Sequence, residues 1–334
     1  MKKTAFVNLA KRIGRLFIAA AITIILCKVT GFGWKFWASS PSFSMTGEDS
    51  LEQNLKTHVY KLSEEIGDIS FYNLKGLREA EDYISKQFAS YGYKVEFQPY
   101  EINGVTVKNI IATKKGAKYP DRFIIVGAHY DNHFNPGADD NASGIAGLLE
   151  AARLLSNYDS ANSIKFIAFV NEEPPFFKTK YMGSRVYASA ARLRNENIKG
   201  AVILEMIGYY SNEPFSQRYP PIFGLFYPNK GNFIGVLANF NSWQLAKEVV
   251  SGLKERALLP VESIATFDFI GGIDFSDNGS FWKEGFASVM VTDTASYRNK
   301  YYHSQSDTYD TLNYKAMAEV VRGIGFALKR LDNK

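Results

Sequence analysis

The stretch "GAHYDNHFNPGADDNASG", residues 127–144, carries two histidines and three aspartates between two apolar segments. The segment that leads into it, "RFIIVGA", is a short continuous apolar run, which predicts a buried strand. The segment at its other end, "ASGIAGLLEAARLLSNY" at 142–158, has apolar residues at helical spacing. A buried strand, a polar loop and a helix in this order are the repeating unit of an α/β fold.

Similar segments lie on both sides of this unit. The predicted strands are 93–102, 107–113, 122–129, 163–171, 201–208 and 286–293, and the predicted helices are 51–67, 77–92, 142–158 and 313–331. Because buried strands are separated by helices, we predict an α/β fold, a three-layer sandwich with a mostly parallel central sheet. The 46% content of hydrophobic residues is ample for a sizeable core.

Histidines and carboxylates follow four of the predicted buried strands. In chain order they are His129 and Asp131, then Glu172 and Glu173, then Glu205, then Asp293 and, on a loop after it, His303. In an open α/β sheet, functional groups gather at the carboxyl ends of the strands. Chance rarely places such side chains at four strand ends, so we expect them to form one site.

These residue types suit a hydrolytic site with two metal ions. Zinc binds histidine nitrogen and carboxylate oxygen, and a catalytic zinc ion keeps one position open for water. Two zinc ions about 3.5–4 Å apart need a bridging carboxylate and can share one water molecule. A further carboxylate that binds no metal is needed as the general base.

Four motifs, "GAHYD…NPGADDNASG", "FVNEE", "LEMIG" and "YYHSQSDTYDTLNY", resemble in order and spacing those of the M28 family of zinc metallopeptidases. The resemblance is to the group of aminopeptidase Y and aminopeptidase S, and it runs from about residue 55 to the C-terminal helix. It implies a zinc-dependent exopeptidase fold of the phosphorylase/hydrolase type. It also implies two Zn²⁺ ions per chain and peptide substrates that are shortened from the amino end.

The resemblance implies a role for each matching residue. Asp140 would bridge the two metal ions, and Glu172 would be the general base. Asp131 would hold the ring of His129 from behind, which fixes the tautomer of the imidazole. The remaining ligands would be His129 and Glu205 on one zinc ion, and Glu173 and His303 on the other.

Glu205 departs from the family pattern, which has an aspartate at this position. We expect Glu205 to bind metal all the same, because a lone buried carboxylate would be costly. Asp277, in "IDFSDNGSF", resembles a family motif near the active site. Together with Phe176, Phe177 and Tyr209 it is predicted to contact the substrate. The alternative for the three aromatic residues is that they only pack long loops against the domain.

Three other polar residues of these motifs are given structural roles. His133 matches no ligand position and is predicted to be an exposed loop residue. Asp139 is predicted to shape the loop or to cap the following helix. Asp307 is predicted to form a turn or to support a ligand from behind.

The first 41 residues differ from the rest of the chain. Residues 1–40 hold seven basic residues and no acidic ones, whereas the remainder carries 32 basic and 34 acidic residues. A nucleic-acid-binding protein should carry its positive charge on the folded domain, so we exclude that class. The apolar run at 16–27 follows a basic start, which predicts a signal peptide or, extended to 16–37, a membrane anchor.

We therefore expect residues 1–41 to be a leader or anchor with a linker, and residues 42–334 to form one M28-type peptidase domain. The domain would be exported to a periplasmic or other extracytoplasmic location. Cys27 is the only cysteine, so the exported part has no disulfide partner.

Three alternatives to an aminopeptidase stay open. A glutaminyl cyclase shares this fold but works with one zinc ion and forms N-terminal pyroglutamate. A carboxypeptidase would need a cation for the substrate carboxylate, and Arg298 or Lys300 lies near His303 in the sequence. A membrane-tethered binding domain on the same fold would lack ligands or the base, but here all of them are present.

Overall fold

The computed structural model describes residues 50–221, 223–268 and 270–333. The segment predicted as a leader or membrane anchor, 16–37, lies outside these residues. In the part of the chain that is described, no helix is both long enough and apolar enough to cross a membrane.

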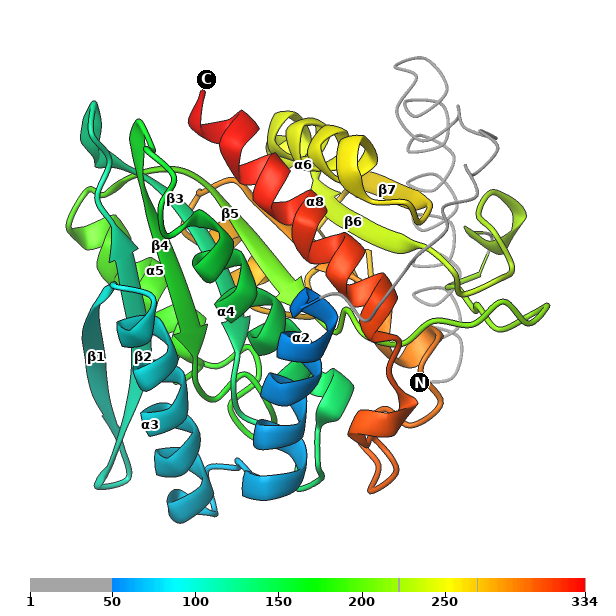
Figure 1. Cartoon of the computed structure of the whole chain (residues 1–334), viewed down its shortest axis with the longest axis horizontal. Coiled ribbons are helices and arrows are strands. Elements are labelled where there is room, and N and C mark those ends of the chain that lie inside the picture. Colours follow the sequence, from blue (N-terminus) through cyan, green and yellow to red (C-terminus); the bar gives the residue numbers. More distant parts are fainter. Residues whose placement is uncertain (1–49, 222, 269, 334) are drawn as a thin grey trace, which may run out of the picture.

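In the described residues, one mixed sheet of eight strands forms the centre (Figure 1). In chain order the strands are β1 (Lys94–Ile102), β2 (Val105–Lys114), β3 (Tyr119–His129), β4 (Asn162–Phe169), β5 (Asn197–Glu205), β6 (Ile234–Asn239), β7 (Val261–Thr266) and β8 (Ser288–Thr292). Across the sheet they follow the order β1-β2-β4-β3-β5-β8-β6-β7. The four central strands, β4-β3-β5-β8, are parallel, as predicted. The strands next to this block, β2 and β6, run antiparallel to it.

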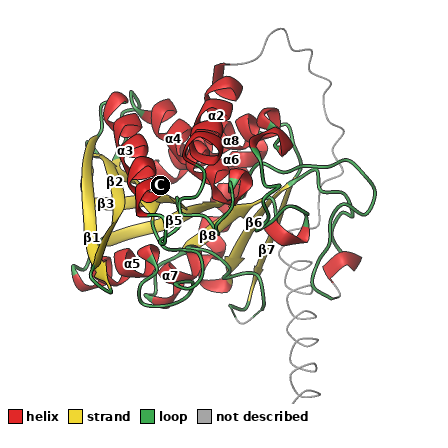
Figure 2. Ribbon diagram, turned by 90° about the horizontal axis from the view of Figure 1, so that it is seen from below, coloured by secondary structure: helices red, strands yellow, loops and turns green. Residues whose placement is uncertain are grey.

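Helices cover both faces of the sheet (Figure 2). One layer consists of α2 (Ser50–Tyr60), α3 (Leu74–Ser90), α4 (Gly144–Leu155), α6 (Trp243–Arg256) and α8 (Tyr314–Asp332), and the other of α5 (Gly183–Leu193) and α7 (Asn278–Lys283). Alternate side chains of β5 enter different cores, since Val202 and Leu204 belong to the larger core and Ile203 to a smaller one with Tyr187 and Phe281. The predicted three-layer sandwich is confirmed.

Asparagine side chains begin two of the predicted helices. The carboxamide of Asn73 accepts the backbone N–H of Gly76 at 3.3 Å at the start of α3. Asn313 accepts the N–H of Ala316 at 3.0 Å at the start of α8. Both are N-cap contacts, which satisfy a backbone donor that the helix itself leaves free.

A strand–helix–strand unit, β6–α6–β7, is absent from the sequence-based prediction. Its strands are short, and one face of each carries residues that break an apolar pattern, such as Gly235 in β6 and Glu262 in β7. The opposite face supplies Val236, Ala238 and Ala265 to the larger core. The unit extends the sheet beyond β8 and, as shown below, forms the floor of a pocket.

Candidate metal centre

The predicted ligands and the predicted base meet at the carboxyl edge of the central strands. They come from the end of β3, the turn at Ala138–Ser143 that follows it, the loop after β4, the end of β5 and the loop after β8. These residues are His129, Asp140, Glu172, Glu173, Glu205 and His303. All are buried except His303, which is partly exposed.

One group of ligands is centred on His129. Its Nε2 atom lies 3.4 Å from Oδ1 of Asp140 and 3.2 Å from Oε2 of Glu205. The three side chains bring one ligand atom each close enough to share a metal ion.

A second group is centred on His303. Its Nε2 atom lies 3.1 Å from Oδ2 of Asp140 and 3.2 Å from Oε1 of Glu173. Asp140 thus turns one carboxylate oxygen to each group. That is the arrangement required of a carboxylate that bridges two metal ions.

The ligand atoms fit zinc in type and in spacing. Nε2 of His129, Oε1 of Glu173 and Nε2 of His303 are buried and have no hydrogen-bond partner in the described part of the chain. Buried polar atoms normally have a partner, so these atoms call for one. Zinc takes imidazole nitrogen and carboxylate oxygen, and two ligands of one tetrahedral zinc ion lie roughly 3.3 Å apart.

Asp131 supports the site, but its carboxylate does not hold the imidazole ring as predicted. Nδ1 of His129 lies 3.0 Å from the backbone carbonyl oxygen of Asp131 and 3.7 Å from Oδ1 of the same residue. Because a carbonyl oxygen only accepts, Nδ1 carries the proton and Nε2 is left free for a metal ion. The carboxylate instead accepts the backbone N–H groups of Glu172 and Glu173, each at 3.1 Å.

Glu172 belongs to neither group of ligands, although it is buried among them. Burial raises the pKa of this carboxyl well above its usual range. His129 opposes that rise, whereas the nearby carboxylates Glu205 and Glu173 add to it. A carboxylate with a raised pKa can hold a transferred proton near neutral pH, which suits a general base.

The loop that presents Asp140 is anchored by two buried aspartates. The carboxylate of Asp307 accepts the backbone N–H of Asp139 at 3.0 Å and that of Asp140 at 3.1 Å. The side chain of Asp139 accepts the N–H of Gly208 at 2.9 Å and the amide of Asn299 at 2.8 Å. Asp139 therefore shapes the loop, and Asp307 supports the proposed bridging ligand.

His303 lies between two aromatic rings. The ring of Tyr302 stacks on it at 3.8 Å between centroids, and the ring of His133 at 4.4 Å. Two rings cannot share one face of an imidazole at these distances, so they cover opposite faces. His133 is half-buried and is not the exposed loop residue that was predicted. It also has a nitrogen within metal-binding reach of Glu173 and His303, which makes it a third histidine at the site.

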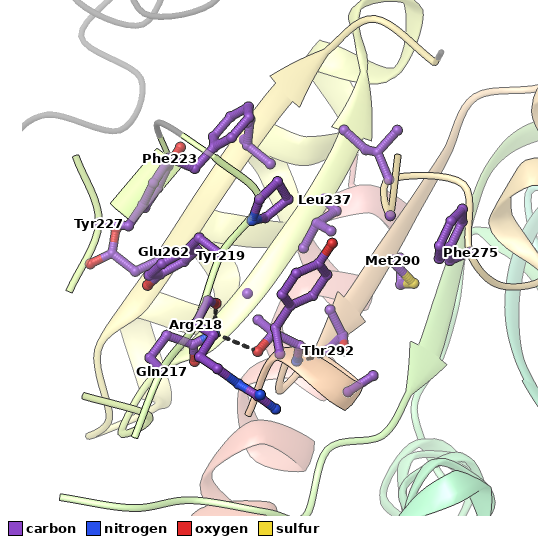
Figure 3. A pocket seen from close by; sticks show the side chains of 18 of the residues that line it. Gln217, Arg218, Tyr219, Phe223, Tyr227, Leu237, Glu262, Phe275, Met290 and Thr292 are labelled. Carbon is purple, nitrogen blue, oxygen red and sulfur yellow. Dashed lines mark hydrogen bonds between the residues drawn. The ribbon is translucent and has the colours of Figure 1, made fainter. Parts of the chain in front are cut away.

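A pocket opens beside Glu205 on the face of β5, β8, β6 and β7. Figure 3 shows Phe275 and Met290 on one side of it, Tyr219 and Tyr227 on the other, with Leu237 between them. Most of its lining is aromatic or aliphatic. It is a hollow suited to an extended side chain next to the metal ligands.

The four residues predicted to contact substrate, Phe176, Phe177, Tyr209 and Asp277, are all described, and none lines this pocket. Phe176 is buried and packs against Phe71 at 4.7 Å between ring centroids. Phe177 contacts the pocket residue Phe275 edge-on, at 6.2 Å between ring centroids, from outside. Asp277 is fully buried, and its carboxylate oxygens have no hydrogen-bond partner in the described part of the chain. Phe176, Phe177 and Tyr209 follow Glu173 and Glu205 in the sequence, whereas strands distant in sequence build this pocket. Contact of the four residues with substrate stays a prediction.

Arg298, considered as the cation of a carboxypeptidase, does not face the site. Its side chain is buried, and its guanidinium donates to Oε1 of Gln217 at 2.8 Å and to the carbonyl oxygens of Phe233 at 2.8 Å and Tyr209 at 3.3 Å. It joins the loop at 209–233 to the segment that carries His303. Nε and Nη1 are engaged in this way, and Nη2 is buried without a partner in the described part of the chain, so the guanidinium is not exposed to a substrate carboxylate and this expectation is corrected.

An α/β sandwich that gathers histidines and carboxylates at the carboxyl edge of its sheet has the layout of a metal-dependent hydrolase. The model of peptidase family M28 matches residues 109–327, and the chain belongs to this family.

Comparison with individual proteins agrees with that assignment. The chain is 42% identical over 285 residues to "Uncharacterized protein YfbL" of Escherichia coli K12, covering 82% of this chain and 86% of that protein. Among solved structures it resembles BSAP, a zinc aminopeptidase from Bacillus subtilis, with a TM-score of 0.67 and 16% identity over 83% of this chain and 94% of that one. It also resembles the glutaminyl cyclase of Fimbriiglobus ruber, with a TM-score of 0.61 and 18% identity over 88% and 99% of the two chains. The two structural likenesses establish a shared fold.

Proposed function

We propose that this M28 family member is a zinc aminopeptidase with two metal ions, which releases single residues from the amino end of peptides. The observation that carries the proposal is the position of Asp140. One of its carboxylate oxygens faces His129 and the other faces His303. A protein built for one zinc ion has no need of two ligand groups joined in this way.

In this proposal His129, Asp140 and Glu205 hold one zinc ion, and Asp140, Glu173 and His303 hold the other. Bound zinc would supply a Lewis acid, which lowers the pKa of a water molecule and polarises the carbonyl group of the scissile peptide bond.

Glu172 would move the proton. It accepts a proton from water as the water oxygen bonds to the carbonyl carbon, and it later donates that proton to the departing amine as the C–N bond breaks. One water molecule is consumed, and a free amino acid and a shortened peptide are formed. The carboxylate of Asp131 accepts the backbone N–H groups of both Glu172 and Glu173, which holds the two residues in a fixed position relative to each other.

The preference for the amino end of a peptide rests on the cations near the site. The charges of the carboxylates that would bind metal are offset by the two zinc ions, so these carboxylates do not by themselves attract an α-ammonium group. Of the two cations considered for a carboxypeptidase, Arg298 is buried and engaged, and Lys300 is exposed beside the ring of Tyr301.

A glutaminyl cyclase is the second candidate, supported by the likeness to the Fimbriiglobus ruber enzyme. It would need one zinc ion, and it would convert an N-terminal glutamine to pyroglutamate without releasing an amino acid. The presence of two ligand groups that share Asp140 speaks against it. The presence of all ligands and the base speaks against a non-catalytic binding domain.

The test combines zinc analysis with peptide turnover on the full-length protein. Two zinc ions per chain and release of the first residue from free peptides, but not from N-acetylated ones, would support the proposal. One zinc ion with formation of pyroglutamate would replace it by the cyclase. Cleavage of acetylated peptides at their carboxyl end would replace it by a carboxypeptidase.

We also propose that the protein acts on the extracytoplasmic side of a membrane. The support is the apolar run at 16–27 after a basic start, with no acidic residue before Glu48. Fractionation of cells that express the full chain, with and without residues 1–41, tests this; equal recovery of both forms from the cytosol would contradict it.

A further inference from the structure

One row of residues crosses the sheet from the candidate metal ligand Glu205 to the outermost strand, β7. Glu205 pairs with Thr292, Thr292 with Gly235, and Gly235 with Glu262. Adjacent strands lie about 4.8 Å apart, so the row spans roughly 14 Å. All four residues line the pocket. The pocket therefore has a carboxylate of the metal centre at one end and Glu262 at the other.

The next row on the same face makes an apolar floor. Leu237 pairs with Met290 on one side and with Ile264 on the other, and each lies two positions along its strand from a residue of the first row. Because side chains alternate along a strand, residues two positions apart point to the same face. All three line the pocket.

Gly235 keeps the middle of the row open. A Cβ atom at this position would lie 3.1 Å from the carbonyl oxygen of Thr292 and 3.2 Å from Cδ1 of Leu237, which is tighter than ordinary contact. No side chain therefore stands between Thr292 and Glu262 in this row. A substrate side chain can lie along the sheet from the metal centre to β7.

The far end of the pocket offers one carboxylate between aromatic rings. Glu262 is partly buried, burial raises the pKa of its carboxyl, and Lys254 of α6 opposes that rise. Tyr219 and Tyr227 lie beside it (Figure 3). Arg218 also lines the pocket, but it is exposed and donates to the carbonyl oxygen of Ser296.

We propose that the pocket selects peptides with arginine or lysine at the amino end, and that Glu262 is the residue that determines this specificity. The proposal rests on the aminopeptidase function proposed above. The aliphatic stem of the substrate residue would lie on Met290 and Leu237. Its cationic tip would pair with Glu262 and stack on the tyrosine rings, which suits a planar guanidinium best.

The test compares zinc-loaded wild type with Glu262→Gln on the 4-nitroanilides of arginine, lysine, norleucine and leucine. Wild type should have its highest kcat/KM on arginine or lysine. Glu262→Gln should lower kcat/KM on arginine about tenfold, since a hydrogen bond to a charged group is lost, and should leave norleucine within about twofold. Glu255→Gln, an exposed change on α6 outside the pocket, should alter neither.

A charge reversal and a binding measurement complete the test. Glu262→Lys should disfavour arginine further than Glu262→Gln does, and near-wild-type thermal unfolding would show that it folds. Titration calorimetry with arginine amide and norleucine amide measures binding without turnover. Arginine amide should bind more tightly than norleucine amide, in the same order as the kcat/KM values of the anilides.

The outcomes separate the two proposals. If all four anilides are inert but arginine amide binds through Glu262, the pocket proposal stands and the aminopeptidase proposal fails. The other outcome is that wild type has the same kcat/KM on the leucine or norleucine anilide as on the arginine anilide, and that Glu262→Gln leaves the ratio of these kcat/KM values unchanged. The pocket proposal is then overturned and the aminopeptidase proposal stands.

Discussion

The hydroxyl of Ser276 donates a 2.6 Å hydrogen bond to Oε2 of Glu205, the oxygen that also faces Nε2 of His129. Glutamate is one methylene longer than the aspartate that the family pattern has at this position, so its side chain has one more rotatable bond. The hydrogen bond from the buried Ser276 holds this longer side chain in one orientation. The loop before α7 thereby sets the direction of a candidate ligand at the end of β5.

Ser276→Ala should therefore weaken zinc binding. Partners that orient a metal ligand are typically worth 10- to 100-fold in metal affinity, and we expect a loss of about that size at one of the two sites. Competition with a chelator measures it. Ser90→Ala, at an exposed serine of α3, serves as the control; equal zinc affinity in the two variants would show that Glu205 is held without the serine.

Glu172→Gln should abolish turnover and leave the zinc content unchanged. The amide cannot accept the proton, and general base catalysis contributes roughly 10²- to 10⁴-fold. Zinc analysis and peptide release are measured on the same preparation. The matched control is Glu101→Gln, at an exposed position of β1. Full activity in Glu172→Gln would falsify the assignment of the base.

The rate of peptide hydrolysis should fall as the pH is lowered. The pKa of Glu172 is raised, chiefly by burial, and the base works only in its ionised form. Activity is therefore present above this pKa and lost as the pH falls through it. A profile of kcat/KM against pH, with zinc content checked at each point, is the measurement. A rate that is flat, or that rises as the pH falls, would contradict this role.

Asp307→Ala should loosen the loop that carries Asp140. Two buried backbone N–H groups lose their acceptor, which should cost roughly 1–3 kcal/mol in the free energy of unfolding. Since Asp140 faces both ligand groups, the affinity for both zinc ions should fall together. Denaturant unfolding and zinc titration test the two effects. Asp310→Ala, an exposed position three residues on, should change neither.

Arg298→Met should impair substrate binding more than proton transfer. The guanidinium joins Gln217 and Phe233 to the loop before His303, and Gln217 and Phe233 both line the pocket. We expect KM to rise severalfold and the melting temperature to drop, because two buried acceptors lose their donor. Steady-state kinetics and a thermal melt measure this. A change in kcat alone would argue against a role in shaping the pocket.

Much of the fold could be read from local patterns. The strands β3, β4, β5 and β8 are buried on both faces, so each appears as a continuous apolar run that a reader of the sequence can find. Their carboxyl ends must meet at one edge once the strands are parallel. That is why His129, Glu173 and Glu205 could be assigned to one site before any geometry was known.

The errors share one cause. His133 was taken for an exposed residue because nothing in its own loop indicates that the ring of His303 lies against it. For Phe176 the sequence left two alternatives open, contact with the substrate or packing of its loop, and its contact with Phe71 could not be read from the sequence. Contacts between residues far apart in the sequence leave no trace in the periodicity of either segment.

The sequence by itself determined the parallel core of the sheet and the identity of the residues at its carboxyl edge. A buried strand and its end can be recognised from residues that are neighbours in the sequence. Only the tertiary structure decided which oxygen of Asp140 faces which histidine, and that Glu262 shares a row with Glu205. The register between strands is set by packing across the whole sheet, and β7 is reached from β5 only through β8 and β6.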